Sequence, residues 1–557
     1  MQKIILLFLV CITFPLFCQG VSEKWASVFI TDSDMSFKVV PYKDPQADAY
    51  ASFLPITPDT GFAQLTVYGN GNKPSDSLEV AYAMGVVESY LTNKMIFDLW
   101  CNSKQLWFPG PHPSENPKVR DWLSQQSDYL DRMVSKYSTT DPYWKEVAFV
   151  RSQGNGLIES YSQFANETSQ LEAWELRTLL YAVDMMDLVE ASNVTFSEQS
   201  FVGKQLMKEK QSKRPTHHGQ KFNPFAPSCS AFVKSFKDGS VATGHTTWGI
   251  YLTMIRIVKT YRYENKKNDP NTPGWAISFS SYPGTITSND DFMVTNAELI
   301  VTETTLNVYN TSLYKRVTPK CVLSYMRGII ANRMSSSSEQ WGQVYSRYVS
   351  GTQNNEWIVV DLKKINSGSY RNYPKNSVMI FEQMPSLIKS KDVTDFINSK
   401  GYWGSYNIPY DTQVWTDLGY KDMEHKFGPD DYSWSDCARA KIFNRNQSLV
   451  TDIKSTQRIM RLNDYLHDPL SKKNPEYAIA DRSDLADQPF IMGGIDTKVI
   501  SSSMYQNNEL LLINGPTQQS LKPFDFSMPQ FSYWKHYGIP DVCDYPWFVY
   551  DLFSEDK

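Results

Sequence analysis

Residues 227–234 read Pro-Ser-Cys-Ser-Ala-Phe-Val-Lys, and here a polar, basic segment changes abruptly into an alternating strand pattern. A small polar residue followed by cysteine at the start of a strand is the arrangement that a self-cleaving precursor needs. In such a precursor the Cys229 thiol attacks the carbonyl carbon of Ser228, and cleavage leaves Cys229 as a new N-terminus. Its α-amine, which titrates near ~8, then serves as the base for its own thiol. The alternative interpretation is an unreactive cysteine buried in a core strand.

The first 20 residues have the layout of a secretory signal peptide. Lys3 precedes an apolar run over residues 4–17, and Cys-Gln-Gly at 18–20 provides the cleavage site. We therefore expect the mature chain to start near Val21. No later stretch approaches the ~18 uninterrupted apolar residues of a membrane span. The sequence thus predicts a protein that enters the secretory pathway and has no transmembrane segment.

Four Asn-x-Ser/Thr sequons agree with export, because N-glycosylation belongs to the secretory pathway. The acceptor residues are Asn166, Asn193, Asn310 and Asn446. We expect all four to carry glycans.

Five cysteines remain once the signal peptide is removed, and an odd number in an exported protein indicates a thiol outside any disulfide. They are Cys101, Cys229, Cys321, Cys437 and Cys543. If Cys229 is that thiol, the other four form at most two disulfides, and the sequence does not choose among the three possible pairings.

The composition is that of a large globular enzyme. The 557 residues are 41% hydrophobic with a formal charge of −5, and a basic face dense enough for nucleic acid is missing outside one short segment. The sequence contains no G-x-S-x-G, H-E-x-x-H, Walker or Rossmann motif and no Cys-x-x-Cys pair. We therefore expect no metal, no cofactor and no nucleic-acid partner, and look for the chemistry around Cys229.

Residues 200–228 form the one basic segment. It combines three prolines with the basic residues Lys204, Lys208, Lys210, Lys213, Arg214 and Lys221. This composition is typical of an exposed, flexible linker accessible to proteases, with a long surface loop as the alternative. The predicted organisation is a signal peptide (1–20), a mainly helical part of the same unit (21–199), a linker removed or displaced on maturation (200–228) and a catalytic part (229–557).

Helical spacing dominates before the linker. Asp76 and Glu79 form a capping pattern for a helix over 76–100, and apolar spacing predicts two more helices, over 119–137 and 173–191. Residues 62–68 alternate like a strand. We interpret the apolar stripes of these elements as core.

Strands dominate after the linker. Residues 229–236 alternate, Lys-Asp-Gly-Ser at 237–240 supplies a two-residue Asp-Gly turn, and residues 241–248 return antiparallel. This register places Trp248 opposite Cys229 and turns His245 to the other face, unless Gly244 hosts a bulge. Further strands are predicted over 275–282, 299–306, 356–361, 377–383 and 510–514, and a helix over 248–263.

Several motifs, in order, resemble the phospholipase B-like family over most of the mature chain. They are Cys-Ser-Ala-Phe-Val-Lys (229–234), His-Thr-Thr-Trp (245–248), Ser-Tyr-Pro-Gly (281–284), Asp-Asp-Phe (290–292), Glu-Thr-Thr (303–305), Glu-Trp-Ile-Val-Val-Asp (356–361), Gly-Tyr-Trp-Gly-Ser-Tyr-Asn-Ile-Pro-Tyr (401–410), Arg-Ala-Lys-Ile-Phe (439–443), Asn-Asp-Tyr (463–465) and Asp-Pro-Leu-Ser (468–471). The resemblance implies an α+β fold, the αββα sandwich of N-terminal-nucleophile hydrolases, with a secreted or lysosomal location and autocatalytic maturation. It also implies a pocket made of Cys229, His245, Trp248, Thr304, Asn407 and Arg439.

Chemistry suggests roles for the implied residues. The Asn407 amide is expected to donate to the developing oxyanion, and Arg439 to lower the thiol pKa or bind an anionic group of the substrate. Thr304 is expected to bond the α-amine, although the strand register decides whether Thr304 or Thr305 faces inward. The sequence departs from the family pattern at Cys437, shortly before the arginine.

The resemblance implies an acyl hydrolase that releases fatty acids from glycerophospholipids and makes transient contact with a membrane surface. Two alternatives remain open. One is an amidase acting on N-acyl lipids or other amides, because a thioester intermediate serves esters and amides alike. The other is a lipid-binding glycoprotein that has kept the fold without turnover.

Overall fold

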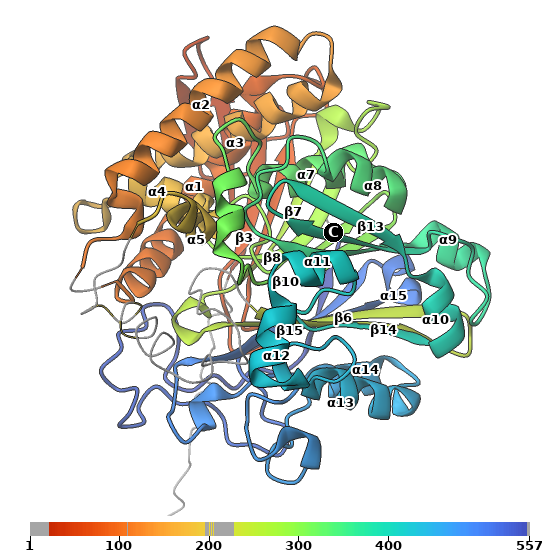
Figure 1. Cartoon of the computed structure of the whole chain (residues 1–557). Coiled ribbons are helices and arrows are strands. Elements are labelled where there is room, and N and C mark those ends of the chain that lie inside the picture. The colour runs from red at the N-terminus through yellow and green to blue at the C-terminus, as the bar shows by residue number, and fades with distance from the viewer. Residues whose placement is uncertain are drawn as a thin grey trace, which may run out of the picture.

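Two sheets form the centre of the molecule in the computed structural model, which describes residues 22–107, 110–194, 200, 202, 204 and 228–553 (Figure 1). The larger sheet has eleven strands in the order β13 (Leu387–Asp392), β12 (Val378–Met384), β11 (Asn355–Asp361), β10 (Leu299–Thr305), β9 (Phe292–Thr295), β8 (Ala276–Ser281), β7 (Ile257–Tyr263), β4 (Ala63–Gly69), β3 (Ala49–Leu54), β1 (Lys24–Ile30) and β2 (Phe37–Val40). The smaller has six, in the order β14 (Tyr402–Ser405), β5 (Ser228–Ser235), β6 (Val241–Ile250), β15 (Met492–Ser501), β16 (Glu509–Asn514) and β17 (Phe548–Asp551).

Strand alternation gives each sheet two apolar faces. In β10, Ile300 joins a buried cluster with Val233 of β5 and Leu512 of β16, so this cluster contains side chains of both sheets. The neighbouring Val301 belongs to a different cluster, which contains residues of the helices. Because successive side chains point to opposite faces, one sheet packs on the other through one face and on helices through the second.

The helices before the linker are α1 (Leu78–Lys104), α2 (Pro117–Tyr137), α3 (Pro142–Phe164), α4 (Ala173–Leu180) and α5 (Ala182–Ala191). Later helices are α7 (Ser324–Met334), α8 (Ser338–Tyr345), α9 (Leu362–Ser367), α10 (Thr394–Lys400), α11 (Thr412–Asp417), α12 (Tyr420–Phe427), α13 (Ala438–Asn446), α14 (Ile453–Met460) and α15 (Ser502–Gln506). Helix α1 packs on β1, β3 and β4 of the larger sheet, whereas α14 packs on β6 and β15 of the smaller.

Most of the elements expected from the sequence are present. All the strands predicted by alternation or apolar runs form, and the helix expected at 76–100 begins two residues later with Ser77, not Asp76, as its N-cap. The expected helix over 173–191 is divided at Tyr181. The helix predicted over 248–263 is wrong, because β6 runs to Ile250 and β7 occupies 257–263. All seven residues of β7 are buried, so its apolar residues carry no alternation that would reveal a strand.

The predicted hairpin register is wrong by one residue. The Phe236 N–H donates to the Ser240 carbonyl oxygen (2.8 Å), so the loop has three residues, and the last of them, Gly239, has φ +89°. A three-residue loop that ends in a left-handed glycine is a common hairpin geometry. Cys229 therefore pairs with Thr247, and His245 lies on the same face as Cys229 without any bulge at Gly244.

Strands from before and after residues 200–228 share the larger sheet, since β4 pairs with β7 in parallel. The expected signal peptide and residues 205–227 of the expected linker lie outside the described residues. Cys101, Cys321, Cys437 and Cys543 form no disulfide in the structure. Within the described part of the chain, none of the helices has the length and apolar character needed to cross a bilayer.

Helices α1 and α3 cross at unusually short range. A Cβ added to Gly156 would lie 2.1 Å from the Tyr82 carbonyl oxygen, and one added to Gly85 would lie 2.0 Å from that of Gln153. No side chain fits at either position, so the two glycines fix how closely the helices approach.

We predict that Gly156→Ala lowers the free energy of unfolding by roughly 3 kcal/mol or more, because the helices must separate to accept the methyl group. Gly328→Ala in α7 is the matched control, since its nearest neighbour, the Trp357 ring, would lie 4.0 Å from the new Cβ. There, helix propensity favours alanine by about 1 kcal/mol. Urea unfolding measures both, and equal stability of the two variants would contradict the prediction.

Candidate functional site

Cys229 is the second residue of β5, and its side chain is fully buried between the sheets. Thr247 of β6 lies opposite, His245 follows on the same face, and Glu303 approaches from β10 of the other sheet. The structure therefore brings His245 and Cys229 together, against the register expected from the sequence.

Glu303 is the titratable side chain that contacts the thiol. Its Oε1 atom lies 3.7 Å from Cys229 Sγ, within hydrogen-bonding range for sulfur. Burial raises the pKa of Glu303 to about 8, against the hydrogen bonds from Cys229 and Thr305, which lower it. Burial also raises the pKa of the Cys229 thiol well above its ordinary value, and the Glu303 charge adds to that increase. The pair therefore holds its protons at neutral pH.

Sequence reasoning did not select Glu303 as a site residue. A signal was present, because the carboxyl interrupts Leu-Ile-Val-Thr-Glu-Thr-Thr, a strand otherwise made of aliphatic residues and threonine. A buried acid in such a strand needs a partner, which makes it a candidate site residue.

His245 is neutral in this environment. Burial lowers the pKa of its imidazole well below the usual value, and the Lys498 ammonium lowers it further. Its Nε2 lies 3.1 Å from the Glu303 carbonyl oxygen, which only accepts, so Nε2 carries the proton. His245 thus braces the backbone at Glu303.

Cys229, His245 and Glu303 each offer a potential metal ligand, with the three atoms within 4.8 Å of one another. The trio has the composition of a zinc site. In this chain, however, the thiol is directed at the Glu303 carboxyl and the imidazole N–H at the Glu303 carbonyl. We assign no metal to these residues.

Asn407 holds the nitrogen of Cys229. Its Oδ1 accepts from the Cys229 N–H (3.2 Å) and from Arg439 Nη1 (3.0 Å), while its Nδ2 donates to the Thr305 carbonyl oxygen (2.8 Å). Two donors on Oδ1 and one acceptor on Nδ2 define the orientation of the amide. The residue has φ +68°, a conformation that asparagine tolerates better than most residues. The oxygen of the amide, and not the donor expected for an oxyanion, faces Cys229.

Thr304 supports Asn407. Its hydroxyl accepts from the Asn407 N–H (3.2 Å) and bonds to the Ser405 hydroxyl (2.6 Å). Of the two adjacent threonines, Thr304 is thus the one whose side chain meets the Asn407 loop.

Arg439 binds the carbonyl group of Cys229, whereas Asn407 binds its N–H. Its Nη1 donates to the Cys229 carbonyl oxygen (2.7 Å), and its guanidinium lies over the Trp248 ring, 4.3 Å from the centroid. Trp248 in turn donates from Nε1 to the Ile479 carbonyl (3.1 Å). Arg439 also donates to the Ser230 hydroxyl. Successive side chains of a strand point to opposite faces, so Ser230 lies on the face of β5 opposite to Cys229. Arg439 was expected to lower the pKa of the Cys229 thiol, but burial raises that pKa instead.

Cys437 is the N-cap of α13. Its buried Sγ accepts from the Ala440 N–H (3.4 Å). It thus fixes the start of the helix that carries Arg439.

Four buried charged side chains form a group next to Thr247. Lys498 bonds the Thr247 hydroxyl, Asp290 (3.1 Å) and Asp496 (2.7 Å), and Arg256 bonds both aspartates. Two cations and two anions make the group neutral overall. It was missed from the sequence, although a lysine within the fully buried strand β15 was a signal.

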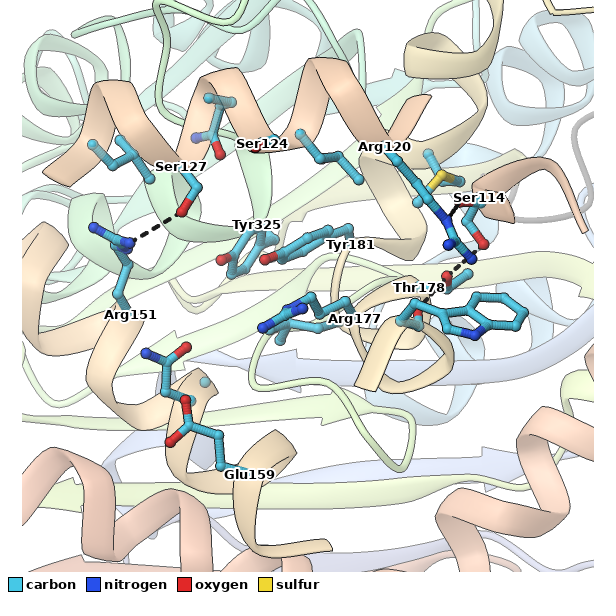
Figure 2. Close-up of a pocket in the computed structure, with 18 residues that line it drawn as sticks. Ser114, Arg120, Ser124, Ser127, Arg151, Glu159, Arg177, Thr178, Tyr181 and Tyr325 are labelled. Atoms are coloured by element: carbon cyan, nitrogen blue, oxygen red, sulfur yellow. Dashed lines mark hydrogen bonds between the residues drawn. The ribbon is translucent and has the colours of Figure 1, made fainter. Parts of the chain in front are cut away.

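A cavity of about 490 Å³ lies elsewhere, among α2, α3, α4, α5 and α7 (Figure 2). None of the six residues expected in the pocket lines it. Cys229 itself is buried in the structure.

Comparison with known proteins identifies the family of this chain. The family model Phospholipase B matches residues 49–550. The chain belongs to the phospholipase B family. It is 33% identical to a putative phospholipase B-like 2 of Bos taurus (94% of this chain, 88% of the relative) and 31% identical to a phospholipase B of Crotalus adamanteus (94% and 91%). A phospholipase B-like protein G of Dictyostelium discoideum is 32% identical (88% and 83%).

A carboxyl pair anchors the Asn407 loop of this phospholipase B family member. Glu356 and Glu382 are cross-strand neighbours, and the Glu382 carboxyl accepts from the N–H groups of Tyr410 and Asp411. Burial raises the pKa of Glu382 to about 7, and burial together with the Glu382 charge raises the pKa of Glu356 well above its ordinary value. The loop is therefore held by carboxyls that favour a protonated state.

We predict that the chain is most stable in mildly acidic solution. The folded pKa values of Glu303 (about 8) and Glu382 (about 7) lie above the ordinary 4.5, so their stabilising contribution is complete below pH 4.5 and is lost as pH rises to about 8. The loss amounts to several kcal/mol, at roughly 1.4 kcal/mol per pKa unit. Thermal unfolding between pH 5 and about 8 measures it.

Glu303→Gln and Glu382→Gln should each reduce this pH dependence. Asp59→Asn is the control, because Asp59 is exposed. A melting temperature that is unchanged or higher at the alkaline end would contradict the prediction.

Proposed function

We propose that the chain is a secreted or lysosomal acyl hydrolase of phospholipase B-like type, with Cys229 as its N-terminal nucleophile after cleavage of the Ser228–Cys229 bond. One observation carries the proposal: Asn407 Oδ1 holds the nitrogen of Cys229 and Arg439 holds its carbonyl oxygen, while the thiol meets Glu303 on the other face. A structural cysteine in a core strand requires no such set of contacts around its own peptide.

The layer arrangement supports the same proposal. Two sheets share one apolar cluster, and helices pack on their other faces. We assign this arrangement to the αββα sandwich of N-terminal-nucleophile hydrolases, in which the nucleophile begins a strand of one sheet, as Cys229 does in β5.

We propose that maturation runs through a thioester. Cys229 Sγ bonds to the Ser228 carbonyl carbon, the bond from that carbon to the Cys229 nitrogen breaks, and the thiol proton passes to the nitrogen, which leaves as an α-amine. Water then hydrolyses the thioester, giving the Ser228 carboxylate and the free thiol. Glu303 is the proposed carrier of the proton, because it contacts Sγ and has a pKa near neutrality.

In turnover the new α-amine takes the thiol proton, as expected for an N-terminal nucleophile. The Asn407 oxygen, supported by Thr304, is placed to hold that amine and aim its lone pair at the thiol. His245 braces Glu303, while Arg439, packed on Trp248, fixes the backbone after the nucleophile. Sγ then bonds to the acyl carbon of the substrate, the ester C–O bond breaks, and the alcohol leaves with the proton held by the α-amine. Water hydrolyses the resulting thioester, which releases the fatty acid and restores the thiol.

The substrate class that we propose is the glycerophospholipid, because the family and its named relatives are phospholipases B or phospholipase B-like proteins. Amidase action on N-acyl lipids uses the same nucleophile and is the alternative. Glycosylation is part of the proposal, since Asn166, Asn193 and Asn310 are exposed and Asn446 is partly exposed.

Incubation of the matured protein with a phospholipid panel and an N-acyl-amide panel, followed by mass spectrometry, tests the substrate class. Free fatty acid from the phospholipids supports the proposal. Release from the amides alone favours the amidase, and release from neither panel leaves a lipid-binding protein.

We predict that Cys229→Ala abolishes both cleavage and turnover, whereas Cys229→Ser retains slow cleavage through its hydroxyl. Glu303→Gln should slow cleavage on the order of a hundredfold, because the amide cannot carry the thiol proton. N-terminal sequencing of the larger wild-type fragment should read Cys-Ser-Ala-Phe. Cleavage of the Cys229→Ala variant at the same bond and rate would assign the cut to another protease.

We predict that Asn407→Ala permits folding and lowers turnover on the order of a hundredfold. In this geometry the loss arises because the amine of Cys229 is no longer held. Asn407→Asp is the matched variant, since it keeps an oxygen acceptor while removing the donor to Thr305. Activity of the aspartate variant below that of the alanine variant would favour the oxyanion role instead.

A further inference from the structure

The cavity among the helices that precede the linker has the features of a second ligand site (Figure 2). Its volume of about 490 Å³ lies in the range of small-molecule pockets. Helices α2, α3, α4 and α5 supply most of its walls and α7 contributes Tyr325, so it shares no lining residue with the Cys229 site.

Three arginines line the cavity, of which Arg120 and Arg177 are exposed and Arg151 is partly buried. Arg120 of α2, Arg151 of α3 and Arg177 of α4 line it, and among the described lining residues Glu159 is the single acidic side chain. The Glu159 carboxylate accepts from the Tyr82 hydroxyl (3.1 Å), and Arg151 forms an ion pair with Asp131 (2.7 Å), which is largely exposed. Three guanidinium groups against these two carboxylates leave an excess of positive charge.

The positions of the polar groups suit an anion. Figure 2 shows the Arg177 guanidinium and the hydroxyls of Tyr181 and Tyr325 pointing toward the side of the cavity where Arg151 lies. The walls also carry small polar side chains, which leave room for a ligand and offer hydrogen bonds: Ser114, Ser124, Ser127, Asn155 and Thr178.

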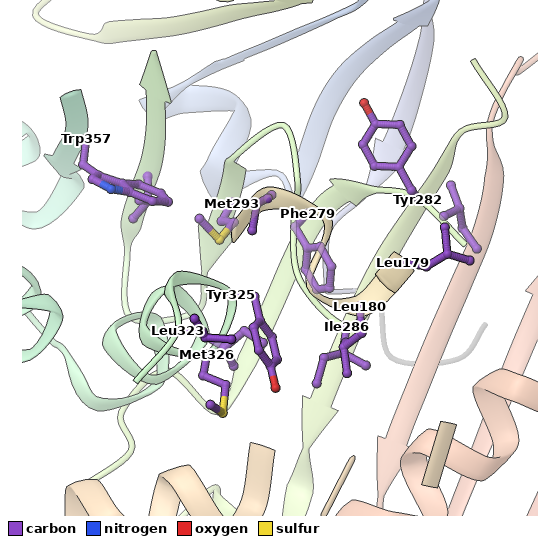
Figure 3. Close-up of a cluster of buried hydrophobic side chains, with 14 of the residues drawn as sticks. Leu179, Leu180, Phe279, Tyr282, Ile286, Met293, Leu323, Tyr325, Met326 and Trp357 are labelled. Carbon is purple, nitrogen blue, oxygen red and sulfur yellow. The ribbon is translucent and has the colours of Figure 1, made fainter. Parts of the chain in front are cut away.

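The floor of the cavity is part of a rigid core. Leu180 and Tyr325 line the cavity and also belong to a buried cluster with Phe279 and Ile286 (Figure 3). Gly154 of α3 faces Leu180, and a Cβ there would lie 3.1 Å from its side chain. The polar groups are thus mounted on packed helices, which reduces the cost of ordering them on binding.

We propose that this cavity binds a small polyol phosphate. Guanidinium groups bind phosphate oxygens through paired hydrogen bonds, and an excess of cations favours a phosphate monoester over a carboxylate. The hydroxyl and amide groups of the walls then bond the polyol. The site is independent of the chemistry at Cys229.

Isothermal titration calorimetry of the full chain at low salt, with glycerol 3-phosphate, tests the proposal. Arg151→Gln and Arg177→Gln should each weaken binding roughly tenfold or more, because each removes charge-assisted hydrogen bonds. Arg458→Gln is the control, since Arg458 is exposed on α14 and does not line the cavity. Melting temperatures of the variants verify that the fold is kept.

Two comparison ligands complete the experiment. Inorganic phosphate lacks the polyol, and octanoate carries a carboxylate in place of the phosphate. Tighter binding of glycerol 3-phosphate than of inorganic phosphate supports recognition of the polyol, whereas equal affinity overturns that part and leaves a phosphate site. Tighter binding of octanoate, binding unaffected by the two arginine variants, or no binding of glycerol 3-phosphate at millimolar concentration overturns the proposal. Cleavage at Cys229 should be normal in both arginine variants, which separates this result from the proposed function.

Discussion

The fixed peptide of Cys229 is the constraint on which the site depends. Its N–H is bound by Asn407 and its carbonyl oxygen by Arg439, and these two side chains also bond each other. Such a closed set of contacts positions the residue from both ends, so the thiol has little freedom except rotation about its own side chain. Preorganisation of this kind reduces the entropic cost of bringing a nucleophile to its target.

Strand alternation then separates two environments around β5. Cys229 faces Glu303 in an interior where burial keeps both groups protonated, whereas Ser230 faces Arg439 on the other side. A guanidinium beside the thiol would favour the thiolate, and its placement behind the backbone avoids that. The structure therefore holds the Cys229 thiol in a fixed position and in its protonated form.

Much of the fold was predictable from local patterns, because alternation in β5, β6 and β10 reflects real faces of two packed sheets. The register of the hairpin was not, since Lys-Asp-Gly-Ser is compatible with a two-residue or a three-residue loop and only the conformation of Gly239 decides. With Gly239 as the third residue of the loop, the register shifts by one, and His245 lies on the same face of the sheet as Cys229.

The sequence indicated several residues that the structure places around Cys229, but not the contacts that they make. The family resemblance pointed to Asn407 and Thr304. Only the structure shows that the Asn407 oxygen faces Cys229 and that the Thr304 hydroxyl binds the Asn407 N–H. Glu303 and the group of four charged residues around Lys498 were not predicted, because a sequence does not distinguish a buried charged residue from an exposed one. Its meaning arises from partners far away in the chain, as when Lys498 reaches Thr247, the residue opposite Cys229. The long-range pairing of the sheets, which no local pattern encodes, is what turns these scattered polar residues into one site.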